Sequence, residues 1–380
     1  MYLCRSFQAL VAPMKGAASV TAVRMFLTLW LVIGHTVTHT FVDVGWKVWW
    51  FRLLDSTLLM TNHVFFSLAA YCVFLSTWAS WRVAPFTVRA RLLLRKASST
   101  WCRMVPNLLL YSAIIVFGFP LLSLHHGPDH IHPGFRLPKP HMGQTWPRQA
   151  LVLPYLVDWL FHGVSRKHPA GLSGTITNTY EMSMVCSVIV FLACSFPRPL
   201  QHAAAIGLAV ALSYSEWGYI RAYGGFSNSV ALYALCCPIF IDWCHQVQPG
   251  LKIRFLFWLR LSCICVLIAS FFSAAHRHHS IGVGISLSLS LSILPSDNKP
   301  MGRWARASRL CLPINMFHTE IILFFFIRIA LGDEPLQASL CVAVAWTLFI
   351  FVCSVVTGAL VFVAFVVPME RCLLKCTSWI

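Results

Sequence analysis

Charged residues are scarce in this sequence. They make up 11% of the 380 residues, whereas 58% are hydrophobic and the mean hydropathy is +0.71. A soluble domain carries about 25% charged residues, so a chain this apolar cannot cover a surface that faces water. This excludes both a soluble enzyme and a disordered protein. The sequence therefore predicts a polytopic membrane protein.

Acidic residues are the scarcest charged class, and the chain is strongly basic as a result. It has 29 Lys and Arg residues against 12 Asp and Glu residues, for a formal net charge of +17. A nucleic-acid-binding protein needs a continuous basic face in water, but long apolar stretches separate the charges here. We therefore expect no nucleic-acid partner and attribute the charge mainly to orientation in the membrane.

The cysteines do not indicate a disulfide scaffold. Most of the 15 lie inside apolar runs, where cysteine behaves as a small apolar residue, and the polar stretch 125–175 contains none. The close pairs Cys236-Cys237 and Cys263-Ile264-Cys265 do not have the spacing of a zinc site, and we expect no metal. The stretch 125–148 is rich in proline and histidine, and a solvated loop is a simpler interpretation than a metal or pH-sensing site. Residues 1–15 show no signal-peptide cleavage site, so the first apolar run is interpreted as an uncleaved signal anchor.

Long apolar runs predict an all-α fold, a transmembrane helical bundle of about ten spans. A bilayer core about 30 Å thick needs about 20 apolar residues per helix. The predicted spans are 21–43, 57–80, 103–124, 177–197, 202–218, 228–246, 253–275, 280–295, 308–330 and 338–367. The segment 280–295 alternates serine with leucine as a strand does, but an open strand edge cannot lie in lipid, so a helix is expected. The run 151–161 is too short to cross and is expected to lie at the interface or to re-enter.

Basic residues predict the orientation and the domain boundaries. The connections 81–103 and 296–309 both carry several cations, and 81–103 has no acid. The positive-inside rule then puts both termini in the cytosol and the loop 125–175 outside or in the lumen. Either the plasma membrane or the endoplasmic reticulum fits. The predicted domains are a cytosolic N-terminus (1–17), one membrane domain (18–370) and a cytosolic tail (371–380).

Two ionisable residues share one face of the first predicted span. Arg24 and His35 are eleven residues apart, so on a helix they differ by about 20° around the axis and about 16 Å along it. Polar groups at membrane depth are costly and need a partner or a function. Gly34 leaves room for a ligand or another helix beside the imidazole. The alternative is an arginine that snorkels to the interface and a packed histidine bonded to a neighbouring carbonyl.

Other candidate residues in later predicted spans are Glu181, Asp242, His318 and Glu320. His318 and Glu320 are two residues apart and point in different directions on a helix, so they do not form a dyad. Asp242 is interpreted as a structural acid. Glu181 either orients His35 or pairs with Arg24, and the sequence leaves both roles open.

These residues lie in motifs that resemble the acyltransferase-3 family of membrane proteins. The segment from Arg24 to His35, in the context Val-Arg-Met-Phe-Leu-Thr-Leu-Trp-Leu-Val-Ile-Gly-His-Thr, is similar to the animal branch called nose resistant to fluoxetine. The resemblance runs from about residue 18 to about residue 370. Further matches follow in the family's order: Phe65-Phe66, Arg103-Met104-Val105-Pro106, Tyr180-Glu181-Met182, Ser308-Arg309-Leu310 and Phe317-His318.

The chain departs from the family's pattern at several motif positions. Thr100 replaces the first arginine of Arg-x-x-Arg, and His63 replaces an acid before Phe65-Phe66. Ile176 stands where a tryptophan is common, and Val366 replaces the acid of a late Glu-x-Pro. The resemblance is therefore to a divergent or shortened member.

The resemblance implies transfer of an acyl group from a cytosolic acyl-CoA to a hydroxyl group of a lipid or small acceptor, at or across the membrane. His35 would be the general base, and Glu181 the carboxylate that tunes its pKa. The CoA phosphates would be bound by cations, namely Arg24, Arg103 and either Arg95 or Lys96. The sequence has no Gly-x-Ser-x-Gly elbow, which favours direct transfer over a covalent acyl-enzyme.

Two other functions are compatible with the same residues. Buried Arg, His and Glu also line substrate or proton pathways in transporters and lipid-handling proteins, although the sequence shows no inverted repeat. A catalytically inactive member would account for Thr100, Ile176 and Val366. For the enzyme, the expected partners are acyl-CoA, a lipid or small hydroxylated acceptor, and membrane lipids.

Overall fold

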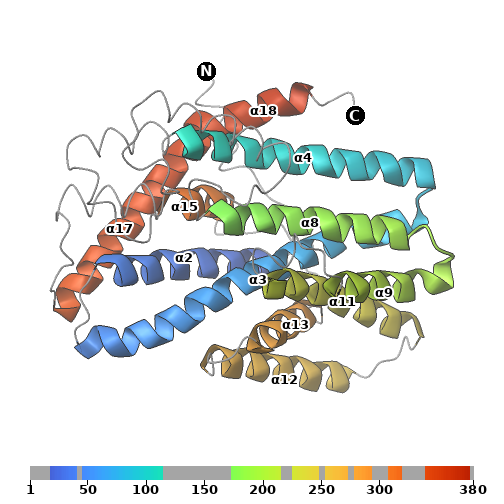
Figure 1. Ribbon diagram of the computed structural model, residues 1–380, viewed down its shortest axis with the longest axis horizontal. Helices are drawn as coiled ribbons and strands as arrows, with labels where there is room; N and C mark the ends of the chain where they lie inside the picture. The colour runs from blue at the N-terminus through green and yellow to red at the C-terminus, as the bar shows by residue number, and fades with distance from the viewer. Residues whose placement is uncertain are drawn as a thin grey trace.

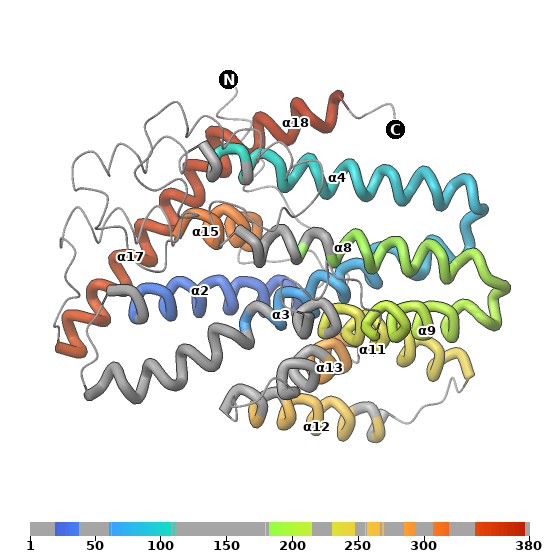
Figure 2. Tube along the Cα trace, in the orientation of Figure 1, coloured from blue at the N-terminus to red at the C-terminus, as the bar shows by residue number. Residues whose placement is uncertain are grey.

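All elements that the structure describes are helices (Figures 1 and 2). The computed structural model describes residues 18–40, 45–113, 173–214, 225–247, 253–272, 278–292, 307–318 and 339–376. A helix satisfies its own backbone polar groups, which lipid cannot do. The predicted all-α fold is confirmed for these residues. The loop 125–172, the N-terminus 1–17, Glu320 and residues 377–380 lie outside them.

Each predicted span coincides with a described helix over at least part of its length. The helices are α2 (Ala18–Thr40), α3 (Gly45–Val83), α4 (Phe86–Ala113), α8 (Ser173–Ala193), α9 (Gln201–Tyr214), α11 (Gly225–Val247), α12 (Ile253–Phe272), α13 (His278–Ser292), α15 (Cys311–Phe317), α17 (Leu340–Val361) and α18 (Val367–Cys376). The short turns η4 (Arg198–Leu200) and η5 (Ser308–Leu310) precede α9 and α15, and a π-helical turn, η7 (Phe362–Val366), joins α17 to α18.

Four apolar segments of the described helices are long enough to cross a bilayer. They are Val20–Val37 in α2, His63–Val83 in α3, Val230–Val247 in α11, and Leu340–Cys376 from α17 into α18. Shorter apolar segments occur in α8 and α12. Several long apolar helices in one chain indicate a membrane protein.

The cation-rich connection expected at 81–103 is mostly helix in the structure. α3 continues to Val83 and α4 begins at Phe86, so only two residues separate them. Pro85 disfavours helical backbone in the residue before it and ends α3, while its carbonyl accepts the amide of Arg89 at 2.9 Å in the first turn of α4. Arg, Leu, Lys and Ala are strong helix formers, which accounts for the helix beyond this break.

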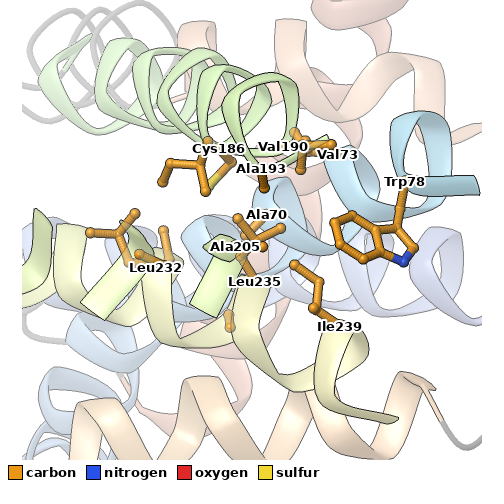
Figure 3. Packing of buried hydrophobic residues seen from close by; sticks show 14 of the residues in the cluster. Ala70, Val73, Trp78, Cys186, Val190, Ala193, Ala205, Leu232, Leu235 and Ile239 are labelled. Carbon is orange, nitrogen blue, oxygen red and sulfur yellow. The ribbon is translucent and has the colours of Figure 1, made fainter. Parts of the chain in front are cut away.

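The largest core joins α3, α8, α9 and α11. Figure 3 shows Cys186 and Val190 of α8 facing Ala70 of α3, with Ala205 of α9 and Leu235 of α11 close by. All five side chains are almost fully buried. Alanine and cysteine are small, so the helix backbones approach closely, as helices packed in membranes commonly do.

The serine-rich segment is helical, as expected. In α13, the hydroxyl of Ser290 donates to the carbonyl of Ser286 at 2.7 Å, and that of Ser292 donates to the carbonyl of Ser288 at 2.6 Å. These bonds satisfy polar groups that would otherwise be costly away from water. The hydroxyl of Tyr71 in α3 donates to the carbonyl of Leu291 at 2.9 Å, which ties α13 to α3.

Another buried cluster joins α2, α15 and α17. Its buried members include Val32, Ile314 and Ile350, one from each helix. Figure 1 shows α17 crossing the ends of the other helices obliquely and α18 bending away from it beside α4. The π-helical turn at 362–366 supplies this bend, since such turns interrupt regular helix geometry.

Candidate functional site

The structure brings His35 of α2 against His318, the residue that caps the C-terminus of α15. The Nδ1 atom of His35 lies 2.9 Å from the Nε2 atom of His318. The two rings are nearly parallel, with an interplanar angle of 7° and centroids 5.1 Å apart. His318 is buried and His35 is half-buried. The two histidines are 283 positions apart in the chain, and only the tertiary fold makes them neighbours.

The hydrogen bonds of this pair determine where its protons lie. The Nδ1 atom of His318 is 2.8 Å from the carbonyl oxygen of Ile314, which can only accept, so that nitrogen carries a hydrogen. In a neutral ring the Nε2 atom of His318 is then the acceptor, and the Nδ1–H of His35 donates to it. This assignment follows from the network. It leaves the lone pair of the neutral His35 ring on Nε2, so this nitrogen is the basic one.

A glycine of α17 allows the close packing that supports this pair. A Cβ atom at Gly358 would lie 2.7 Å from the Cγ1 atom of Ile314 and 3.4 Å from its backbone nitrogen. Carbon atoms in contact are normally about 3.5–4.0 Å apart, so no larger residue fits without movement. Ile314 supplies the carbonyl that binds His318. The position of the histidine therefore depends on the contact between α15 and α17.

Arg24 contacts a different neighbour from His35. Its Nη2 atom donates to the Sγ atom of Cys72 in α3 at 3.7 Å, and the hydroxyl of Thr28 donates to the backbone carbonyl of Arg24 at 3.0 Å. The guanidinium thus contacts α3, and it also interacts electrostatically with Cys311, the first residue of α15. His35 lies beside the other end of α15, so this helix is a neighbour of both residues.

Lys96 of α4 contacts α3 one helical turn beyond the residue that Arg24 contacts. Its Nζ atom donates to the hydroxyl of Ser76 at 2.6 Å, and Ser76 follows Cys72 by four residues. Burial lowers the pKa of Lys96, and the positive charge of Arg103 acts in the same direction. A partly desolvated ammonium interacts more strongly with an anion than a fully hydrated one. Lys96 is therefore a better-placed anion ligand than its exposed neighbour Arg95.

Arg103 lies on the outside of the same helix. Its side chain is 67% exposed, and its Nε atom is 3.4 Å from the carboxylate of Glu370 in α18. An ion pair this exposed contributes little to stability. Arg103 is accessible to a charged ligand and also links α4 to α18.

Asp242 forms a second polar cluster, at the end of α11. Its Oδ2 atom accepts four contacts of 2.8–3.0 Å. They come from Trp78 and Arg82 of α3, His202 of α9 and Gln246 of α11 itself. One carboxylate oxygen thus joins three helices, which agrees with the interpretation of Asp242 as a structural acid.

The predicted carboxylate partner of His35 is not among the described side chains. Glu181 lies in α8, but its side chain is outside the described part of the structure, as is all of Glu320. Within the described ranges, no group of three or more His, Cys, Asp or Glu residues is arranged to hold a metal ion. The sequence singled out both histidines separately but not their pairing, because no spacing links positions so distant.

Comparison of the chain with protein-family models, with curated proteins and with solved structures finds no match.

Proposed function

We propose that the protein is an integral membrane acyltransferase that moves an acyl group from a cytosolic acyl-CoA to a hydroxyl group of a lipid or small acceptor. The observation that carries the proposal is the bond between His35 Nδ1 and His318 Nε2, because it supports a basic lone pair on His35 Nε2. The resemblance of the Arg24–His35 segment to the acyltransferase-3 family supports the choice of reaction. In this proposal the chain has about ten spans and cytosolic termini, and lies in the plasma membrane or the endoplasmic reticulum.

In the proposed reaction, His35 acts as the general base. Its Nε2 atom takes the proton of the acceptor hydroxyl while the oxygen attacks the thioester carbonyl. The bond between the acyl carbon and the CoA sulfur then breaks, and the proton passes from His35 to that sulfur. His318 holds the ring in the required tautomer, and Glu181 is the proposed carboxylate of the site.

The donor would be bound by the cations at the cytosolic end of the bundle. Arg24 and Lys96 contact neighbouring turns of α3, and Arg103 lies further along α4. Separated positive charges suit the several phosphates of CoA, and the exposed Arg95 would add to their field. The pantetheine arm is long and thin, which fits the distance of about 16 Å along α2 between Arg24 and His35.

Transport is the second candidate function. Two hydrogen-bonded histidines within a membrane domain also suit a proton relay, and the same contact therefore favours a proton-coupled carrier. The two functions differ in whether the thioester is broken. An inactive family member would show neither activity.

The test uses purified protein in liposomes, a panel of labelled acyl-CoA donors and total membrane lipid as acceptor. We expect release of free CoA together with label in lipid, and a loss of about 10²–10⁴-fold in His35→Ala, the usual contribution of a general base. His202→Gln, a buried histidine outside the pair, is the matched control. Full turnover by His35→Ala would remove the histidine from the mechanism, and passage of label without CoA release would favour transport.

A variant series at His318 tests its positioning role. The side-chain amide of His318→Gln can still accept from His35 Nδ1, whereas His318→Leu cannot. A lost hydrogen bond of about 0.5–1.5 kcal/mol corresponds to a rate reduction of up to about tenfold. The kcat of His318→Leu should therefore be several-fold lower than that of His318→Gln, with little change in the KM for the donor. Equal rates for the two variants would contradict this role.

A further inference from the structure

The last described helix, α18, carries two exposed cysteines that play no part in the proposed reaction. Cys372 and Cys376 are both exposed. They are four residues apart, so on a helix they differ by about 40° around the axis and about 6 Å along it. They therefore form one continuous thiol face.

This thiol face points away from the rest of the protein. Glu370 of α18 lies against Arg103 of α4, and Cys372 and Cys376 are about 160° and 120° from it around the helix. α18 thus packs through one side and presents the two thiols on the other. Arg371 and Lys375, both exposed, lie on the side of α18 adjacent to the thiols.

The length of the preceding helix places α18 at the membrane surface. α17 has 22 residues, or about 33 Å, which already spans a hydrocarbon core of about 30 Å. The apolar segment continues to Cys376, but the π-helical turn at 362–366 bends the chain before α18 begins (Figure 1). A straight crossing therefore ends near this turn, and α18 follows it in the interfacial region.

The charges on either side of α17 indicate which surface this is. Asp333 and Glu334 precede α17, whereas Arg371 and Lys375 follow its turn. By the positive-inside rule, the basic side faces the cytosol. The same cations attract α18 to an anionic leaflet.

We propose that Cys372 and Cys376 are sites of reversible S-acylation by a long-chain acyl-CoA. Juxtamembrane cysteines on amphipathic helices are typical acceptors of this modification. In each step the cysteine Sγ forms a thioester with the acyl carbon, the bond between that carbon and the CoA sulfur breaks, and the thiol proton ends on the released CoA. Two buried chains anchor a segment far more firmly than one, so the pair would hold α18, and with it α4, at the cytosolic leaflet.

The test is a mass-tag exchange on the full chain expressed in cells. Free thiols are first blocked, thioesters are cleaved with hydroxylamine, and the released thiols are coupled to a polyethylene glycol maleimide. We expect hydroxylamine-dependent species with one and two tags. Each of Cys372→Ser and Cys376→Ser should lose the two-tag species, and the double variant should lose all tags.

Cys341→Ser is the matched control, because Cys341 is also exposed but lies at the opposite end of α17. It should leave the tags unchanged. The abundance of each variant is measured on the same gel. If the double serine variant is less abundant than the wild-type chain, a double alanine variant, Cys372→Ala with Cys376→Ala, replaces it. Absence of tags on the wild-type chain, persistence of tags in the double variant, or their loss in Cys341→Ser would each overturn the proposal.

Discussion

Replacement of Gly358 by alanine tests how the histidine pair is supported. The added Cβ would lie 2.7 Å from Ile314 Cγ1, about 1 Å closer than carbon atoms normally pack. Ile314 is β-branched and therefore stiff about its first side-chain torsion, and its backbone nitrogen is only 3.4 Å from the new atom. Neither side chain nor backbone can retreat freely, so α17 must move away from α15. Such overpacking costs about 1–3 kcal/mol.

Gly207→Ala is the matched control for this substitution. Gly207 also lies inside a helix, but a Cβ atom there would have no heavy atom within 4 Å outside the neighbouring backbone of its own helix. Alanine is favoured over glycine in a helix by about 0.5–1 kcal/mol, so this variant should be neutral or slightly more stable. Unfolding in detergent, followed by tryptophan fluorescence against temperature and denaturant, measures both. We expect Gly358→Ala to unfold earlier and to lose acyl transfer, because Ile314 holds His318. Equal stability of the two variants would refute the reasoning.

Two further predictions concern charges. Asp242→Asn should lower the free energy of unfolding by about 2 kcal/mol, since it breaks a partly buried network. Glu370→Gln is the control and should lower it by less than about 1 kcal/mol, because its partner Arg103 is exposed. Equal losses of the two variants in a denaturant titration would contradict the structural role of Asp242. Because burial lowers the pKa of Lys96, its charge is lost at a lower pH than that of an ordinary lysine. The Kd for acyl-CoA should therefore rise as pH increases through the alkaline range, and Lys96→Arg should remove this dependence; an unchanged profile in that variant would exclude Lys96 as the source.

Hydrophobic runs predicted helices at the right positions because apolar length is a local property. Even the alternating serines of α13 were correctly expected to be helical, since lipid excludes an open strand. The connection at 81–103 was harder to predict. Its cations indicated an exposed segment between spans, but side-chain charge does not prevent helix formation. Only Pro85 marks the break that the structure has there.

In the candidate site, too, the positions of residues along one helix could be predicted, but their contacts with other helices could not. Arg24 and His35 were placed on one face of a helix by their spacing alone, and α2 is indeed continuous between them. Spacing says nothing about the partner helix, so the sequence did not indicate that Arg24 contacts Cys72 or that Lys96 contacts Ser76. These contacts depend on which faces of α2, α3 and α4 pack together.

The choice of partner for His35 shows why this limit matters for chemistry. A carboxylate and a neutral histidine can both accept the Nδ1 proton of His35, and either leaves the lone pair of the neutral ring on Nε2. The motif that contains His35 does not choose between them, because the candidate partners lie far away in the chain. In the structure, the fold brings His318 into hydrogen-bonding distance of Nδ1. The tertiary contact, rather than the motif that contains His35, therefore determines which nitrogen of the proposed base can accept a proton.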